Sequence, residues 1–296
     1  MLGYFEDFEM QIDIDSHSTV VPAPYINANG AAIPALGYGT YGMHGTGLVR
    51  MIQAALKTGF RHIDTAQVYG NEAEVGEGVA LSGIPRSEVF ITTKVWVANY
   101  PPSRFALSVD ESRRSLRTSY IDLLLLHWPT DAVPLADQIG ALNAVVQSGK
   151  VRHIGVSNFN KALLQQAVQL SETPLVTNQF EYHPYLSQSA IVAATRSAGM
   201  AVTAYCGMAV GRVFSDPTLK EIASRYEKAI SQVVLRWLVQ QDGVVALSRT
   251  TNENRLADNL AVFDFELASK DMAAIHNLAQ PNGRIVSPPG LSPRWD

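Results

Sequence analysis

The stretch Ser119-Tyr120-Ile121-Asp122-Leu123-Leu124-Leu125-Leu126-His127-Trp128-Pro129 predicts a very apolar strand that ends in a histidine. It belongs to a rhythm that begins at residue 34, in which short apolar or β-branched runs alternate with longer segments of helical period. The eight predicted strands are 35–40, 60–66, 89–96, 122–128, 152–158, 175–182, 200–206 and 243–249. Because each run is followed by a helical stretch, we predict an α/β fold, the (β/α)8 TIM barrel.

The helical stretches carry their own signals. Polar residues open amphipathic runs over 71–82, 103–116 and 231–240, where apolar side chains recur at helical spacing. The run 269–278 predicts an extra C-terminal helix after the eighth unit. Residues 25–33, with Asn29-Gly30 between apolar neighbours, predict an N-terminal β-hairpin, which we expect to close the bottom of the barrel.

The chain has 296 residues, of which 47% are hydrophobic, so it can bury one large core. Barrels of this class often reach such a length as one domain. Residues 1–24 differ from the rest, because they contain five acidic residues and no Lys or Arg. We interpret 1–24 as a poorly ordered extension and 25–296 as a single barrel.

Charge and composition exclude several classes of protein. The formal net charge is −4, and the first fifteen residues contribute −5, which leaves about +1 for the rest and no basic surplus for nucleic acid. No apolar stretch is long enough to span a membrane. Cys206 is the single cysteine, so there is no internal disulfide. The acidic start does not resemble a secretory signal, and we expect a cytoplasmic monomer.

Residues 37–42 match the pattern G-x-G-x-x-G, and Asp64 follows about twenty residues later, as in dinucleotide-binding Rossmann folds. Such glycine patterns are common, and this one conflicts with the barrel rhythm. The alternative is a tight turn after the first strand, where the backbone at Gly39 and Thr40 approaches a ligand closely.

Four titratable residues lie at the ends of three consecutive predicted strands. The segment 59–72 places Asp64 at a strand end and Tyr69 in the following loop, while Lys94 and His127 end the next two strands. The C-terminal ends of barrel strands all meet on one face, so these four side chains are expected to converge.

Together these groups suit proton donation to a carbonyl. We expect the ammonium of Lys94 to lower the pKa of the Tyr69 phenol, and the carboxylate of Asp64 to keep the lysine charged. His127 can orient a substrate oxygen by a hydrogen bond. The set can then protonate the oxygen of a carbonyl whose carbon receives a hydride. Taken singly, each residue has a structural alternative: a helix cap, a buried ion pair or a core histidine.

A metal site is not expected. The second strand offers His62-x-Asp64 rather than a pair of histidines, there is no His-Glu-x-x-His, and one cysteine cannot build a cluster. His183 has no suitably spaced partner, and we interpret it as structural.

From about Ile26 to Asp296, these motifs resemble the aldo-keto reductase family. The resemblance implies that Tyr69 is the general acid, that Lys94 and Asp64 tune it, and that His127 orients the carbonyl. The segment 149–159 is similar to the signature of the fifth strand in this family.

The resemblance also implies NADPH as the cofactor, bound extended across the barrel face without a Rossmann motif. Ser157, Asn158 and Gln179 would hold the nicotinamide carboxamide, and Tyr205 would stack on the ring. Gly39, Thr40 and Asp64 are expected to contribute further cofactor contacts.

The segment 247–255 follows the eighth strand, where barrels often bind phosphate. Its arginines, a threonine hydroxyl and the start of a helix suit a dianion. By resemblance, the 2′-phosphate site and the adenine site would contain Arg249, Thr250, Arg255 and Asn259. Many family members have Pro and Lys at positions 248 and 249, so the balance between NADPH and NADH stays open, as does a purely surface role for the two arginines.

Aromatic residues are expected to line the substrate pocket: Tyr41, Trp96, Trp128 and Trp295. Such walls, with short neighbouring loops, favour small aldehydes, dicarbonyls and keto-sugars. The alternative for Trp96 and Trp128 is strand-end packing. Two other classes of function stay open, a nucleotide-sensing binding module with this fold and a metal-dependent hydrolase. The tail 282–296 and the segment 204–211 carry a narrower resemblance within the family.

Overall fold

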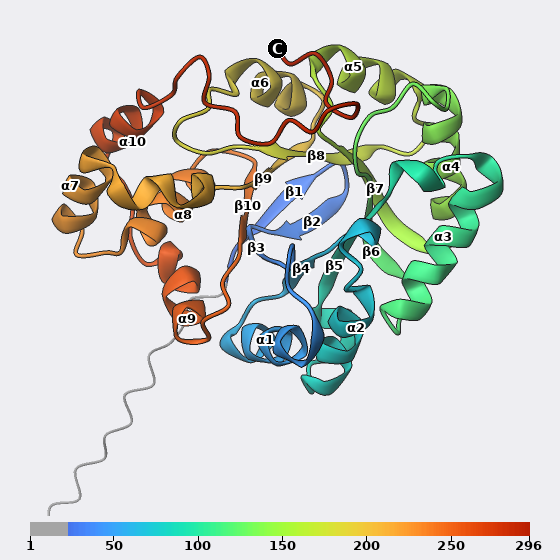
Figure 1. The fold of residues 1–296 in the computed structure, drawn as a ribbon, viewed down its shortest axis with the longest axis horizontal. Coiled ribbons are helices and arrows are strands. Elements are labelled where there is room, and N and C mark those ends of the chain that lie inside the picture. The colour runs from blue at the N-terminus through green and yellow to red at the C-terminus, as the bar shows by residue number, and fades with distance from the viewer. Residues whose placement is uncertain (1–22) are drawn as a thin grey trace, which may run out of the picture.

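A computed structural model describes residues 23–296, and the mouth of its barrel faces the viewer in Figure 1. Eight parallel strands close on themselves in the order β10-β3-β4-β5-β6-β7-β8-β9. They are β3 (Leu36–Gly39), β4 (His62–Asp64), β5 (Phe90–Val95), β6 (Ile121–Leu126), β7 (Val151–Ser157), β8 (Leu175–Glu181), β9 (Ala201–Tyr205) and β10 (Val244–Ser248). The predicted TIM barrel is confirmed.

Each predicted strand is found, but most are shorter than the apolar run that marks them. The largest difference is at β4, which covers three residues of the predicted 60–66. Phe60 donates its backbone N–H to Ala55, at the end of the preceding helix, rather than to a strand. Ala66 leads directly into a short 3-10 turn. Phe60 and Ala66 therefore belong to connections, although both are buried as deeply as the strand.

Helices form the outer layer around the barrel (Figure 1). The α-helices are α1 (Gly45–Thr58), α2 (Glu72–Leu81), α3 (Pro102–Ser115), α4 (Leu135–Gln147), α5 (Lys161–Leu170), α6 (Ser189–Ser197), α7 (Pro217–Arg225), α8 (Ile230–Val239), α9 (Asn254–Leu260) and α10 (Ser269–His276). The 3-10 helices are η1 (Gln67–Tyr69), η2 (Arg86–Glu88), η3 (Val97–Asn99), η4 (Ala209–Ser215) and η5 (Ala261–Phe263). The predicted extra helix is α10, which follows the eighth unit.

The N-terminal hairpin closes the bottom of the barrel, as predicted. Strands β1 (Tyr25–Ala28) and β2 (Ala31–Pro34) pair antiparallel across Asn29-Gly30, where both residues have positive φ, as a tight two-residue turn requires. A small interior core joins the hairpin to four barrel strands, and its buried members are Ala28, Ala31, Ile33, Leu123, Leu125, Val176, Ala201 and Val245. The main core lies between the barrel and its helices.

The first glycine of the G-x-G-x-x-G pattern has a packing role. Gly37 lies inside β3, and a Cβ there would lie 2.7 Å from the Leu247 side chain and 2.8 Å from the His62 ring. Only a residue without a side chain fits such a gap. The closed barrel thus excludes the Rossmann interpretation of this motif.

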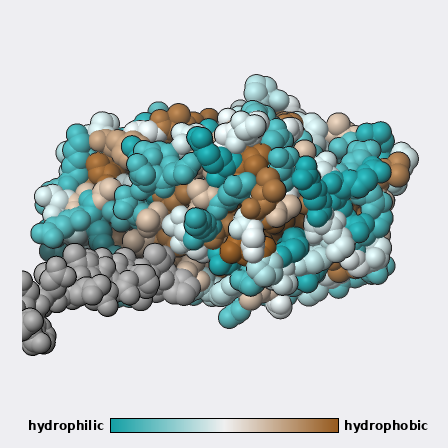
Figure 2. All heavy atoms as spheres, turned by 90° about the horizontal axis from the view of Figure 1, so that it is seen from below, coloured by the Kyte–Doolittle hydropathy of each residue, from teal (hydrophilic) through white to brown (hydrophobic). Residues whose placement is uncertain are grey.

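Figure 2 shows one side of the barrel, where hydrophilic residues predominate and hydrophobic ones are visible between them. Within residues 23–296, no helix is long and apolar enough to cross a bilayer. The extension predicted for residues 1–24 falls almost entirely outside the described residues, so that prediction stays untested.

A buried histidine near the bottom of the barrel should make stability depend on pH. Burial lowers the pKa of His62 to about 4, although the charge of Asp64 acts in the opposite direction. The unfolded chain takes up a proton below about pH 6.5, which the folded state resists until about pH 4, so stability falls as the pH drops through that window. Between about pH 7 and about pH 5, His62 should cost roughly 2 kcal/mol of unfolding free energy.

Urea unfolding at the two pH values measures this loss. His62→Gln, whose amide can still reach the Thr92 hydroxyl that lies 2.9 Å from the imidazole, should lose about 2 kcal/mol less than the parent. Equal losses in both proteins would show that His62 does not carry the effect.

Candidate active site

Three neighbouring strands carry the four predicted catalytic residues to the mouth of the barrel. Asp64 is the last residue of β4, Lys94 lies one residue before the end of β5, and His127 directly follows β6. Tyr69 ends the turn η1, which closes at Gly70 with a left-handed φ of 63°. The short turn thus returns the tyrosine to the strand ends from which the chain has just emerged.

A buried ion pair forms the base of the site. The Lys94 Nζ lies 2.6 Å from Asp64 Oδ1 and also donates to the Thr65 carbonyl at 2.8 Å. Lys94 is fully buried, and its Nζ lies 5.1 Å from the centre of the Tyr69 ring. A buried cation needs such partners, because an uncompensated charge is costly in a protein interior.

The rings of Tyr69 and His127 pack against each other next to this pair. Their centroids are 5.6 Å apart in an edge-on arrangement, and the Trp96 ring also packs edge-on against His127, at 5.4 Å. The His127 Nδ1 is buried and has no partner among the described residues. The structure therefore brings the four predicted residues into one cluster.

The expected direction of the Tyr69 pKa is wrong in this structure. Burial raises the pKa of Tyr69 well above its ordinary value, and the negative charge of Asp64 raises it further. Burial likewise lowers the pKa of His127 well below its ordinary value, and the charge of Lys94 adds to this. The site thus holds a protonated phenol and a neutral imidazole, which is a proton donor beside a hydrogen-bonding group.

Glu72, the first residue of α2, also lies at the site, although it is not among the predicted site residues. Its Oε1 accepts a hydrogen bond from the Thr93 hydroxyl at 2.5 Å, and burial raises the pKa of its carboxyl while the charge of Lys94 lowers it. Glu72 is thus a second acidic group near the buried lysine. Its position in the sequence indicates only the start of a helix. Neighbouring residues do not indicate that its carboxyl contacts Thr93.

The residues predicted to hold a carboxamide lie together and bond to one another. Asn158, with a φ of 63°, donates to the His127 carbonyl at 3.0 Å and accepts from the Tyr205 hydroxyl at 2.7 Å. The Ser157 hydroxyl donates to the Gln179 carbonyl at 2.9 Å. Gln179 in turn donates to Asp64 Oδ2 at 2.9 Å, which links this network to the ion pair. A ligand amide would have to exchange with these internal bonds.

The predicted phosphate segment lies across the barrel mouth from that network, after β10. Arg249 is exposed, and its Nε donates to the Tyr41 carbonyl at 2.6 Å, while Arg255 is exposed at the start of α9. Thr250 is buried, and Asn259 is buried with its amide donating to the Ser248 hydroxyl at 2.8 Å. The two guanidinium groups are thus accessible to an anion, whereas Asn259 is already paired.

Gly39 and Thr40 lie between these two regions. The Thr40 N–H and hydroxyl both donate to the Asp64 carbonyl, at 3.1 and 3.0 Å. Thr40 therefore fixes the backbone at the catalytic strand end. A Cβ at Gly39 would have no contact closer than 3.8 Å, so the glycine is not required there by packing.

The four predicted pocket residues differ in exposure. Tyr41 is 68% exposed, and its ring packs edge-on against Tyr69 at 5.1 Å. Trp96 is half-buried beside His127. Trp128 is only 6% exposed, and its ring centre lies 6.3 Å from that of Trp295 in the C-terminal tail. Tyr41 and Trp96 thus pack directly on Tyr69 and His127, while Trp128 contacts the tail.

These residues fit an extended dinucleotide. The two arginines, Arg249 and Arg255, follow β10. The amide and hydroxyl groups lie at the ends of β7 and β8. In the order of strands around the barrel, Tyr69 and His127 lie between these two regions. No group of three or more potential metal ligands occurs within residues 23–296. His183 is fully buried, and its Nε2 lies 2.8 Å from Glu181 Oε1, which can accept a hydrogen bond from it.

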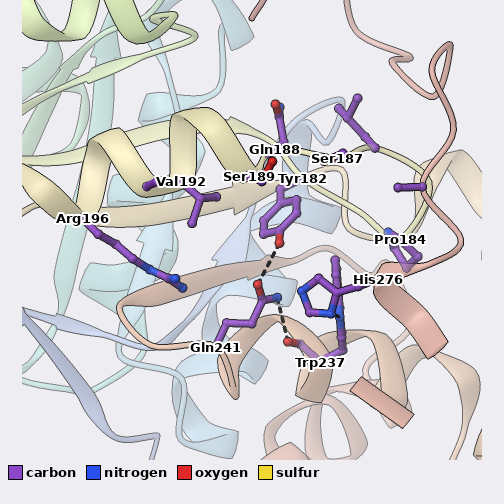
Figure 3. Close-up of a pocket in the computed structure, with 13 residues that line it drawn as sticks. Tyr182, Pro184, Ser187, Gln188, Ser189, Val192, Arg196, Trp237, Gln241 and His276 are labelled. Atoms are coloured by element: carbon purple, nitrogen blue, oxygen red, sulfur yellow. Dashed lines mark hydrogen bonds between the residues drawn. The ribbon is translucent and has the colours of Figure 1, made fainter. Parts of the chain in front are cut away.

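A separate surface pocket of about 240 Å³ lies on the outside of the barrel between α6, α8 and α10. Figure 3 shows its wall, where the Tyr182 hydroxyl donates to Gln241 and Gln241 donates to the Trp237 carbonyl. Arg196 lies at the opposite edge of this pocket. None of the predicted site residues lines it, so we assign it no part in the reaction.

The barrel, the four gathered side chains and the accessible cations define an oxidoreductase site. The chain belongs to the aldo/keto reductase family, whose model matches residues 35–280. It is 39% identical over 267 residues to methylglyoxal reductase DkgB of Salmonella typhimurium, covering 89% of this chain and 99% of that protein. The family resemblance inferred from the motifs is confirmed.

Solved structures extend the comparison. A putative 2,5-diketo-D-gluconic acid reductase B is 56% identical with a TM-score of 0.91, over 93% of this chain and 98% of that one. The Bombyx mori aldo-keto reductase in complex with NADP is 34% identical with a TM-score of 0.82, over 88% and 94%. The narrower resemblance carried by the tail was to 2,5-diketo-D-gluconate reductase B and methylglyoxal reductases, and it is confirmed as well. Relatives named as reductases support carbonyl reduction as the class of reaction.

Proposed function

We propose that this protein reduces small aldehydes, dicarbonyls and keto-sugars to alcohols with NADPH. The observation that carries the proposal is the cluster in which Tyr69, His127 and the Lys94–Asp64 pair meet at the barrel mouth. Bound NADPH would supply the hydride to the carbonyl carbon. The names of a methylglyoxal reductase and of an NADP complex among the relatives support both the substrate class and the cofactor.

Each residue of the cluster has a distinct part in the proposed reaction. His127 donates a hydrogen bond to the carbonyl oxygen and so orients the carbonyl. Tyr69 gives its proton to that oxygen as the carbon–oxygen double bond becomes a single bond. The phenolate left behind is stabilised by the ammonium of Lys94, which Asp64 holds in place. The phenolate then regains a proton from solvent.

The cofactor would lie across the barrel mouth. Ser157, Asn158 and Gln179 would hold the carboxamide, with Tyr205 against the nicotinamide ring and Asp64, Gly39 and Thr40 close by. Arg249, Thr250 and Arg255 would bind the 2′-phosphate, with Asn259 near the adenine. The two exposed guanidinium groups suit a phosphate dianion, which favours NADPH over NADH.

The decisive assay follows NADPH oxidation by purified protein with methylglyoxal, an aromatic aldehyde and a keto-sugar, with NADH run alongside. We expect turnover with NADPH on at least the first two substrates. Tight NADPH binding without turnover of any carbonyl would contradict the proposal and favour a nucleotide-sensing module.

Replacing either arginine of the phosphate segment should change cofactor preference. In Arg249→Ala and in Arg255→Ala, the Kd for NADPH should rise about tenfold or more, because a charge-assisted bond to the 2′-phosphate is lost. The Kd for NADH, which lacks that phosphate, should change little. Fluorescence titration of each cofactor measures both, and Arg114→Ala on the exposed face of α3 is the matched control. Equal weakening of both cofactors would contradict a phosphate site.

A further inference from the structure

A fully buried carboxylate ends β8 beside the proposed site. Glu181 is 0% exposed, and its two oxygens accept the backbone N–H groups of Ile285 at 2.7 Å and Val286 at 2.8 Å. His183 Nε2 lies 2.8 Å from the same carboxylate, and Arg284 Nη1 lies 3.8 Å from it. Two successive amides of the C-terminal tail are thus bound to one acceptor in the barrel wall.

The position of Glu181 on its strand directs it to the barrel mouth. It lies two residues after Gln179, so both side chains project from the same face of β8. Its register partner on β9 is Tyr205, whose pKa is raised by burial and further by the charge of Glu181. The carboxylate therefore borders the network that links Asn158 to Asp64.

The tail segment that carries this anchor forms a strap along the rim of the mouth, which we define as residues 284–296. Figure 1 shows it in red, crossing from the region of α10 to the vicinity of α5. Its far end is fixed at the start of α5, where Asn160 donates to the Arg294 carbonyl at 2.8 Å and Asp296 accepts from the Lys161 N–H at 2.9 Å.

Residues of the strap also contact one another, and the strap contacts Trp128, one of the predicted pocket residues. The Arg284 guanidinium lies 3.6 Å above the Trp295 ring, and the Trp295 Nε1 donates to the Ser287 hydroxyl at 3.2 Å. Trp295 in turn faces Trp128, the residue that follows His127. Arg284 thus lies between the Glu181 carboxylate and the Trp295 ring and links the two.

We infer that Glu181 is a positioning residue that fixes the strap beside the Tyr69–His127 pair and so sets how tightly the carbonyl substrate binds. The inference rests on the proposed function for its substrate, but the anchor itself does not. In Glu181→Gln, the amide nitrogen cannot accept a hydrogen bond, so the carboxylate's partners compete for one oxygen, and Arg284 loses its counter-charge. The strap is then held less tightly at this end, and the contact of Arg284 with Trp295 is weakened, although the bonds of Asn160 and Lys161 to the far end remain.

The first test measures the anchor without turnover. Hydrogen exchange at the Ile285 and Val286 amides should be at least about tenfold faster in full-length Glu181→Gln than in the parent, because their acceptor is weakened. Asp122→Asn is the matched control, since Asp122 is also buried and accepts a backbone N–H, from Ile91, but lies at the start of β6. That variant should leave exchange in the strap unchanged.

The second test measures the consequence for the substrate. In Glu181→Gln, KM for methylglyoxal should rise about tenfold with a much smaller change in kcat, whereas Asp122→Asn should leave KM unchanged. Trp295→Ala should raise KM as well, and the double variant should be no worse than the more affected single one, because both act through the same strap. Multiplying effects on KM would show that Glu181 acts by another route.

The outcomes separate the two proposals. A parent protein without carbonyl turnover overturns the proposed function, yet the exchange measurement still decides whether Glu181 anchors the strap. Turnover by the parent with unchanged KM or unchanged exchange in Glu181→Gln overturns the inference. If that variant does not fold, Arg284→Ala, which changes only the strap, should give faster exchange at Ile285 and a raised KM, and parental values for both would overturn the inference.

Discussion

Tyr69→Phe should lower kcat for methylglyoxal by at least about a hundredfold, which is the scale of general acid catalysis. The substitution removes the proton donor but keeps the ring, so the edge-on contacts with Tyr41 and His127 remain available. NADPH binding should persist, because the hydroxyl is not among the groups proposed to hold the cofactor. NADPH oxidation at saturating substrate measures the loss.

A matched control makes the same chemical change elsewhere. Tyr120→Phe removes a phenol hydroxyl next to the start of β6, at the opposite end of the strand from His127, and should keep parental activity. If Tyr69→Phe reduces methylglyoxal at the parental rate, another group delivers the proton and the proposed chemistry is wrong.

Substitution in the Lys94–Asp64 pair is expected to have the second large effect, on both stability and activity. Comparing the two losses separates a catalytic role of the pair from a structural one. Asp64→Asn leaves the fully buried ammonium without its nearest counter-charge, and breaking a buried pair on one side costs about 3–5 kcal/mol of unfolding free energy. The lower end is expected here, because the charge of Glu72 also favours the ammonium form. Activity should fall as well, since Lys94 is no longer held by a carboxylate.

The double variant Asp64→Asn/Lys94→Met decides between the two roles. Removing both charges should restore most of the lost stability, because no uncompensated ion remains. It should not restore activity, because nothing then stabilises the Tyr69 phenolate. Urea unfolding and kcat are measured on the same samples, and a stable double variant with parental kcat would mean that the pair is only structural.

Local pattern predicted much of this protein. The eight strands, the hairpin turn at Asn29-Gly30 and the extra helix follow from periodicity and turn chemistry, which are properties of neighbouring residues. The gathering of Asp64, Lys94 and His127 was also predictable. Barrel topology brings the C-terminal ends of all strands together, so a residue at the end of a strand is expected at the barrel mouth.

Other features could not be predicted, because they depend on burial and on partners distant in the chain. The pKa of Tyr69 moves upward because of burial, to which the charge of Asp64 adds, and the degree of burial is known only once the rings around it are in place. Glu72 gave a local signal for a helix start alone, although its carboxyl reaches Thr93. The hydrogen bond from Arg249 to the Tyr41 carbonyl likewise connects the residues that follow the last and the first barrel strands, β10 and β3.

The sequence by itself determined the barrel fold, the kinds of side chain at its mouth and the family, because each of these follows from short segments of neighbouring residues. Only the tertiary structure decided which protonation states those groups adopt and what holds the tail. Glu181 meets Ile285 and Val286 across more than a hundred residues, and no local spacing encodes that contact. Packing of the whole chain excludes water from the carboxylate and brings the two amides to it, and that arrangement exists only in the folded molecule.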